Sequence, residues 1–195
     1  MLIHLVVKIQ KKRCWLVLLN PIQGIKPVAA KSDMRHTQAD YENALNKTAL
    51  MTAIDLGKFD AMLALLDRGA NANFENRLNT TALIQACVTG KLEMVSALLV
   101  NGALPDYETR DGRTALIHAS MVGNEDAILA LVQRGANINL ETSQARTALI
   151  MAAVSGDTAA IRTLVACGAD PNHENSRHLT ALAWAAEMGK VRAPR

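Results

Sequence analysis

The chain has 195 residues, of which 50% are hydrophobic and only 3% aromatic, and its formal net charge at pH 7 is +3. A charge this small, without a basic block in the repeated part of the sequence, disfavours nucleic acid as the main partner. The three cysteines, Cys14, Cys87 and Cys167, are odd in number and form no CxxC pair. We therefore expect reduced thiols, as in the cytosol or nucleus, rather than a disulfide framework.

Residues 1–36 are expected to form an irregular or poorly ordered N-terminal extension. Their two apolar runs, at 2–7 and 14–19, are separated by basic residues. Each run is far shorter than the roughly 20 residues that a membrane-spanning helix needs, and the second is also short for a signal peptide. The sequence thus disfavours a membrane anchor. Because the first acidic residue is Asp33, a mitochondrial leader stays open as an alternative.

From residue 37 onward the sequence repeats with a period of 33 residues. The triplet Thr-Ala-Leu begins at Thr48, Thr81, Thr114, Thr147 and Thr180. An alanine and a glycine follow each triplet at fixed distances, as Ala53 and Gly57 do in the first copy. A glutamate also stays in phase, at Glu42, Glu75, Glu108, Glu141 and Glu174. A fixed period of this length indicates stacked repeats, in which one unit cannot bury its own apolar face.

Each unit is predicted to contain a short helix, a turn, a second helix and an extended finger. In the first copy the short helix covers about 49–56, with Thr48 as its N-cap and Gly57 as the residue that ends it. The second helix runs to about Arg68 and carries an apolar stripe. The Asn-rich segment 71–79 has no such stripe and is read as the finger.

These units resemble the ankyrin repeat family. The five copies read TALMTA, TALIQA, TALIHA, TALIMA and TALAWA, where the family pattern is Thr-Pro-Leu-His-x-Ala. The resemblance implies an all-α solenoid of stacked helix-turn-helix units with β-turn fingers, over residues 37–195. Alanine replaces the family's proline, and Ile84, Ile117 and Ile150 replace its histidine, so we expect apolar packing at those three positions. His118 lies one place later and does not take the family histidine's role.

The last unit is expected to be truncated. Gly189 begins a second helix, but the chain ends at Arg195. A terminal unit normally carries a polar capping face, so Leu182, Ala185 and Ala186 are expected to lack a cover and their helix to fray. A fragment or isoform of a longer protein is the alternative to a chain that caps itself incompletely.

The resemblance also implies a binding surface, because ankyrin-like stacks bind proteins in a concave groove lined by the fingers and the first helices. The groove positions of this chain combine apolar residues with arginine, a frequent interface hot spot, so we expect the partner to be another protein with acidic and apolar side chains. The partner-binding residues predicted in this way are Arg77, Val88, Arg110, Arg113, His118, Met121, Val122, Arg146, Met151 and Trp184.

A structural role for the arginines competes with this interpretation. Each arginine could simply pair with a finger glutamate, such as Arg110 with Glu108 or Glu141. Exposed pairs of this kind contribute only about 0–1 kcal/mol and select no partner. The glutamates themselves are expected to be solvated residues of the turns.

The predicted function is a protein–protein interaction module, an adaptor, scaffold or inhibitor, and the expected location is the cytoplasm, with the nucleus also open. The alternative is the targeting segment of a larger enzyme, such as a kinase or a ubiquitin ligase. We predict no catalytic residue, cofactor or metal site in the chain itself. Its histidines lack metal-ligand spacing, and its Ser and Cys residues have no phased base partner. The histidines are His4, His36, His118, His173 and His178.

Overall fold

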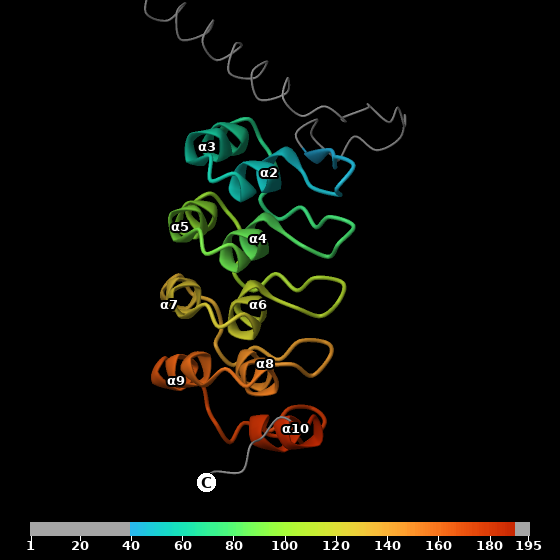
Figure 1. Cartoon of the computed structure of the whole chain (residues 1–195), viewed down its shortest axis with the longest axis vertical. Helices are drawn as coiled ribbons and strands as arrows, with labels where there is room; N and C mark the ends of the chain where they lie inside the picture. Colours follow the sequence, from blue (N-terminus) through green and yellow to red (C-terminus); the bar gives the residue numbers. More distant parts are fainter. Residues whose placement is uncertain (1–39, 190–195) are drawn as a thin grey trace, which may run out of the picture.

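The computed structural model describes residues 40–189. This part of the chain contains nine α-helices and no strand, and Figure 1 shows them stacked in successive layers. The first helices of the units are α2 (Ala49–Asp55), α4 (Ala82–Val88), α6 (Ala115–Met121), α8 (Ala148–Ser155) and α10 (Ala181–Glu187). The second helices are α3 (Phe59–Asp67), α5 (Leu92–Val100), α7 (Glu125–Gln133) and α9 (Thr158–Ala166). The predicted all-α repeat solenoid is confirmed.

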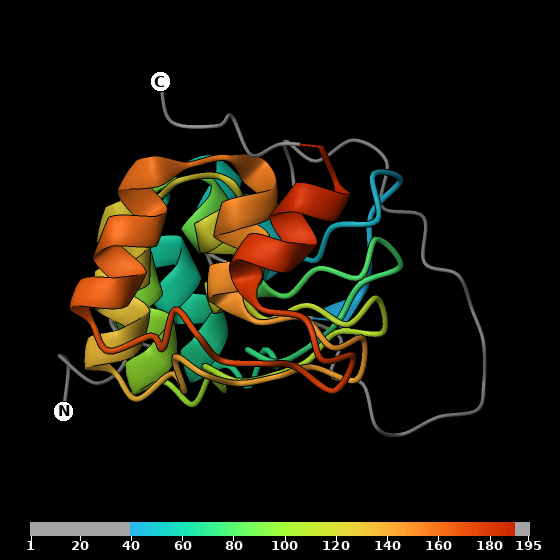
Figure 2. The ribbon, with the colours of Figure 1, turned by 90° about the horizontal axis from the view of Figure 1, so that it is seen from below.

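The three parts of each unit form three parallel columns. Seen along the stack in Figure 2, the second helices lie on one side, the fingers on the other and the first helices between them. Each first helix packs against the first helix of the next unit, and α3, α5, α7 and α9 pack in the same way. The first helices therefore contribute both to the core, together with the second helices, and to the surface that adjoins the fingers.

A threonine caps every first helix, as predicted. Its hydroxyl oxygen accepts a hydrogen bond of 3.2–3.3 Å from the backbone N–H three residues later. The five cap pairs are Thr48–Met51, Thr81–Ile84, Thr114–Ile117, Thr147–Ile150 and Thr180–Ala183. Caps of this kind contribute typically about 1 kcal/mol each, which matters for helices of seven or eight residues.

The core consists of small and aliphatic side chains. Ala86, Ala119 and Ala152 are fully buried, and with no side chain beyond Cβ they let consecutive first helices approach closely. Ile84 and Ile117 are 1–2% exposed, which confirms the apolar packing predicted where the family has histidine. The thiol of Cys87 lies in the same layer, and its burial raises its pKa to about 12.

The last described helix is only partly covered. Leu182 is 67% exposed and Ala186 is also exposed, as expected for a terminal unit. The expectation for Ala185 is wrong, because α10 packs against α8 and leaves that residue 2% exposed. The predicted extension at residues 1–36 and the predicted start of a second helix after Gly189 lie outside the described residues. None of the described helices has the length and apolar character needed to cross a membrane.

Candidate functional site

The fingers are closed by the same tight turn in every unit. In the second finger the backbone N–H of Asn76 donates to the carbonyl of Thr80, and the N–H of Asn79 donates back to the carbonyl of Asn76. Asn79 has a φ of +54°, and the equivalent residue of the third finger is Gly112, with a φ of +67°. Because both ends of each turn are hydrogen-bonded, the finger tips hold fixed positions beside the first helices.

The glutamate column joins each finger to the next. Glu42, Glu75, Glu108 and Glu141 each accept a hydrogen bond from the backbone N–H that lies 35 residues later. The donor residues are Arg77, Arg110, Ser143 and Ser176, at 2.7, 3.0, 3.0 and 2.8 Å. Hydrogen bonds from Ser176 also lower the pKa of Glu141.

These contacts correct two of the expectations from sequence. The glutamate column is not simply solvated, since the Glu75 side chain is only 5% exposed. Arg110 pairs with Glu75 of the preceding finger, at 3.7 Å between Nε and Oε1, and not with Glu108 or Glu141. The predicted partner was wrong because the fingers are offset, so that a glutamate lies under the tip of the following unit.

Arg77 and Arg110 nevertheless expose most of their side chains. Arg77 Nε lies 3.2 Å from Glu42 Oε2, yet its side chain is 81% exposed, and that of Arg110 is 70% exposed. Their positive charges thus stand at the finger tips with a buried or nearly buried carboxylate behind each of them. They are available to a partner, but each charge is already matched.

A second row of hydrogen bonds runs along the base of the fingers. Asp40, Asn73, Asp106 and Asn139 each accept from the backbone N–H that lies 31 residues later. The donors are Asn71, Leu104, Asn137 and Asp170, at 2.8–3.3 Å. Together the two rows tie the finger column into one continuous support.

The first helices present a surface toward the fingers that differs from unit to unit. We call it the inner face and define it by positions 47, 52, 55 and 56 of the first unit and their equivalents at intervals of 33 residues. It exposes a row of apolar side chains near the helix ends: Leu56, Val88, Val122 and Met188, which are 65, 44, 52 and 56% exposed. Met121 lies half-buried between them.

Two predicted residues are less available than expected. Met151 is 9% exposed, so it belongs to the core rather than to the surface that a partner could reach. Trp184 is half-buried, and the Arg177 guanidinium lies 5.4 Å from the centre of its ring. An arginine over an indole at this distance is a cation–π contact, and it covers part of the ring.

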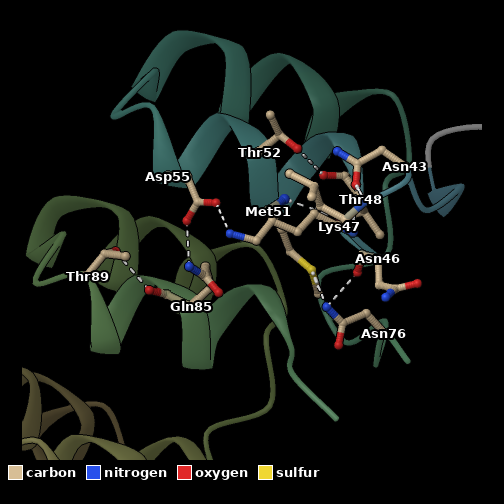
Figure 3. A network of polar contacts seen from close by, with 11 residues as sticks. Asn43, Asn46, Lys47, Thr48, Met51, Thr52, Asp55, Asn76, Gln85 and Thr89 are labelled. Atoms are coloured by element: carbon tan, nitrogen blue, oxygen red, sulfur yellow. Dashed lines mark hydrogen bonds and ion pairs between the residues drawn. The ribbon is translucent and has the colours of Figure 1, made fainter. Parts of the chain in front are cut away.

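The inner face of the first unit is occupied by a closed polar network (Figure 3). The carboxylate of Asp55 accepts hydrogen bonds from the ammonium of Lys47 and from the side-chain amide of Gln85. One positive charge therefore meets one negative charge. Lys47 was not among the residues predicted from the sequence, although the repeat register places it at the position of Arg113 and Arg146 in later units.

The third and fourth units carry a different cluster at the equivalent place. Arg113 Nε lies 3.3 Å from Asp111 Oδ2, and Arg146 Nη1 donates to the backbone carbonyl of Asp111 at 3.1 Å. The hydroxyl of Thr109 lies 2.6 Å from the other carboxylate oxygen of Asp111. Arg113 is about one-third exposed and Arg146 is half-buried. Arg113, Arg146 and Asp111 thus meet at one point on the inner face.

His118 lies next to this cluster on α6. Its Nε2 atom is buried and makes no hydrogen bond within the described residues, and the same holds for Arg113 Nε. Burial lowers the pKa of His118, the charge of Arg113 lowers it further, and Asp111 acts in the opposite direction. The imidazole is therefore neutral at pH 7.

The described residues contain no group of three His, Cys, Asp or Glu side chains that could hold a metal ion. His173 and His178, which share one finger, each lie near a glutamate instead, at 3.8 Å from Glu141 and 4.0 Å from Glu174. The inner face presents exposed aliphatic groups in a row, together with the guanidinium groups of Arg113 and Arg146.

A family model for ankyrin repeats matches the chain in three copies, over residues 3–106, 50–142 and 131–193. No curated protein gives a match. The matches together run from residue 3 to residue 193 of 195, and the described units repeat the same caps, turns and glutamate bonds. On this evidence the chain belongs to the ankyrin repeat family.

Proposed function

We propose that the chain is a protein-interaction module, an adaptor, scaffold or inhibitor, that binds a segment of another protein on its inner face. Ankyrin repeats are in general protein–protein interaction modules, and the family is typically non-catalytic. The observation that carries the proposal for this chain is the row of exposed apolar side chains beside the finger arginines.

A comparison of the five units distinguishes the positions of this surface from the positions that hold the stack together. The cap threonine and the core alanine are identical in all five units, whereas the position of Val122 holds Leu56, Thr89, Ser155 and Met188 in the other units. Framework positions keep one residue because the stack requires it. A position that changes from unit to unit while staying exposed is free to serve recognition.

The chemistry of the face indicates the kind of segment that it fits. Leu56, Val88 and Val122 offer apolar contacts, while Arg77 and Arg110 at the finger tips attract negative charge. Apolar contacts and arginines are the features that dominate interface energetics. The partner segment is therefore expected to combine acidic and apolar side chains.

The test compares two triple variants of the full chain in quantitative pull-downs. The first changes Arg110 at the finger tip, and Arg113 and Met121 of the inner face, to alanine. The second changes Leu129, Arg134 and Arg162, which are exposed on the second helices α7 and α9 or at their ends. Each variant removes two positive charges and one large apolar side chain, so net charge and composition are matched.

Proteins captured by the wild type should be lost with the first variant and kept with the second. If both variants capture the same proteins as the wild type, the inner face is not the binding surface. Circular dichroism of both variants checks that the stack remains folded.

A further inference from the structure

The cluster at Asp111 holds more positive than negative charge. Arg113 and Arg146 carry two positive charges, Asp111 carries one negative charge, and His118 beside them is neutral. Arg146 makes no ion pair with any carboxylate of the described residues and reaches only the backbone carbonyl of Asp111. One positive charge on a half-buried surface is thus left without a counter-charge from residues 40–189.

Three other cationic residues of the fingers are matched one to one, and a fourth, Arg177 of the last unit, lies over the ring of Trp184. Lys47 pairs with Asp55, Arg77 with Glu42 and Arg110 with Glu75. Taking a guanidinium partly out of water is unfavourable unless it is paired. The excess at Asp111 is therefore a departure from the pairing of Lys47, Arg77 and Arg110.

We propose that Arg146 and Arg113 bind one carboxylate of the partner segment, either an Asp or Glu side chain or a C-terminal carboxylate. This inference rests on the proposed function, since it places one group of the bound segment on the inner face. Arginine suits the role because its planar guanidinium can bind both oxygens of a carboxylate.

The amount of charge favours a carboxylate over a phosphate group. One unmatched positive charge balances a carboxylate, whereas a phosphorylated side chain carries about −1.5 to −2 at pH 7. In the unit of Arg113, the exposed apolar side chain of the inner face is Val122, the residue that ends α6. We therefore expect the bound segment to carry an apolar residue close to its acidic one.

The experiment selects ligands from a phage-displayed library of random 16-residue peptides on the full chain. Peptides are kept if the substitution Val122→Asp abolishes their binding, which locates them on the inner face. The selected sequences should share one acidic position next to an apolar one. A representative peptide is then made with its acidic residue, with the neutral amide in its place, with phosphoserine in its place, and with the acid only as its C-terminal carboxylate.

Each peptide is titrated by calorimetry against the wild type, Arg146→Gln and Arg162→Gln. Arg162 is an exposed residue of α9, so its substitution removes the same charge from another face. Replacing the acid by its amide should weaken binding to the wild type and to Arg162→Gln by about ten- to a hundredfold, the range for hydrogen bonds to charged groups. The Arg146→Gln protein should bind both peptides equally weakly.

Three results would overturn the inference while leaving the proposed function in place. They are selected peptides without a shared acidic position, an acid effect that persists in Arg146→Gln, and tighter binding of the phosphoserine peptide. Comparison of the side-chain and C-terminal acids shows which carboxylate the site takes. If no selected peptide depends on Val122, the proposed function itself fails.

Discussion

Glu75 provides the sharpest test of whether the glutamate column stabilises the fold. Its carboxylate is nearly buried and accepts from the backbone N–H of Arg110 at 3.0 Å and from the hydroxyl of Tyr107 at 3.1 Å. The substitution Glu75→Ala removes both acceptors. Hydrogen bonds to charged groups contribute about 1.5–3 kcal/mol. Because the Arg110 side is open to water, we expect a loss near the lower half of that range, about 2 kcal/mol of unfolding free energy.

The chain contains a matched control for this substitution. Glu174 occupies the same position in the last finger, but its side chain is 63% exposed and only approaches His178, at 4.0 Å. The substitution Glu174→Ala should therefore change stability by less than about 0.5 kcal/mol. Glu75→Gln keeps an acceptor without the charge and should lie between the two alanine variants.

Urea unfolding followed by circular dichroism measures the free energies, and hydrogen exchange at the Arg110 amide reports the lost bond directly. Stacked repeats can unfold in parts. If the slopes of the unfolding curves differ between variants, the free energies are not comparable and the exchange measurement at Arg110 is used instead. If Glu75→Ala and Glu174→Ala change the free energy of unfolding equally, and the Arg110 amide keeps its protection, the glutamate column is not a source of stability.

Three further predictions follow from other residues. Gly112→Ala should lower the melting temperature more than Gly69→Ala does. Both glycines have a positive φ, but an added Cβ at Gly112 would lie 2.6 Å from a side chain of the next finger, and an added Cβ at Gly69 would have nothing within 4 Å. Because the pKa of His118 is lowered in the folded state, the unfolded chain binds the proton more readily. The free energy of unfolding should therefore fall as the pH drops below about 6.5 towards the folded-state pKa. If His118→Gln leaves the pH dependence of unfolding unchanged, this linkage is absent. The buried thiol of Cys87, with its pKa raised to about 12, should resist alkylation in the folded state while the half-buried Cys167 reacts; peptide mapping by mass spectrometry distinguishes them, and equal labelling would show that α4 opens readily.

Much of the fold could be predicted because its causes are local. A threonine before each first helix and a glycine after it specify the helix ends within a few residues, and the 33-residue period repeats that information five times. The inter-finger contacts could not be predicted in the same way. Glu75 meets a residue one period and two positions further on, an offset that depends on how the fingers lean in space. The signal available in the sequence was the recurrence of a glutamate at this position in every unit.

The candidate site shows the same division between register and side-chain placement. The period correctly put His118 and Met151 at equivalent positions, yet His118 stays half-buried while Met151 enters the core. A flexible apolar side chain can fill an irregular gap, and the register says nothing about such gaps. The shared contact of Arg113 and Arg146 with Asp111 likewise arises only when two fingers are placed side by side.

The hydrogen-bond donors to the glutamate column are backbone groups, and this affects which substitutions the finger tips tolerate. Because each bond uses a backbone N–H, the side chain of the donor residue is not needed for it, and the chain places Arg, Arg, Ser and Ser at the four donor positions. Any residue except proline supplies that N–H. Mutation can therefore change the side chains at these four donor positions almost without constraint from folding, so the charge that the finger tips expose can be altered by single substitutions.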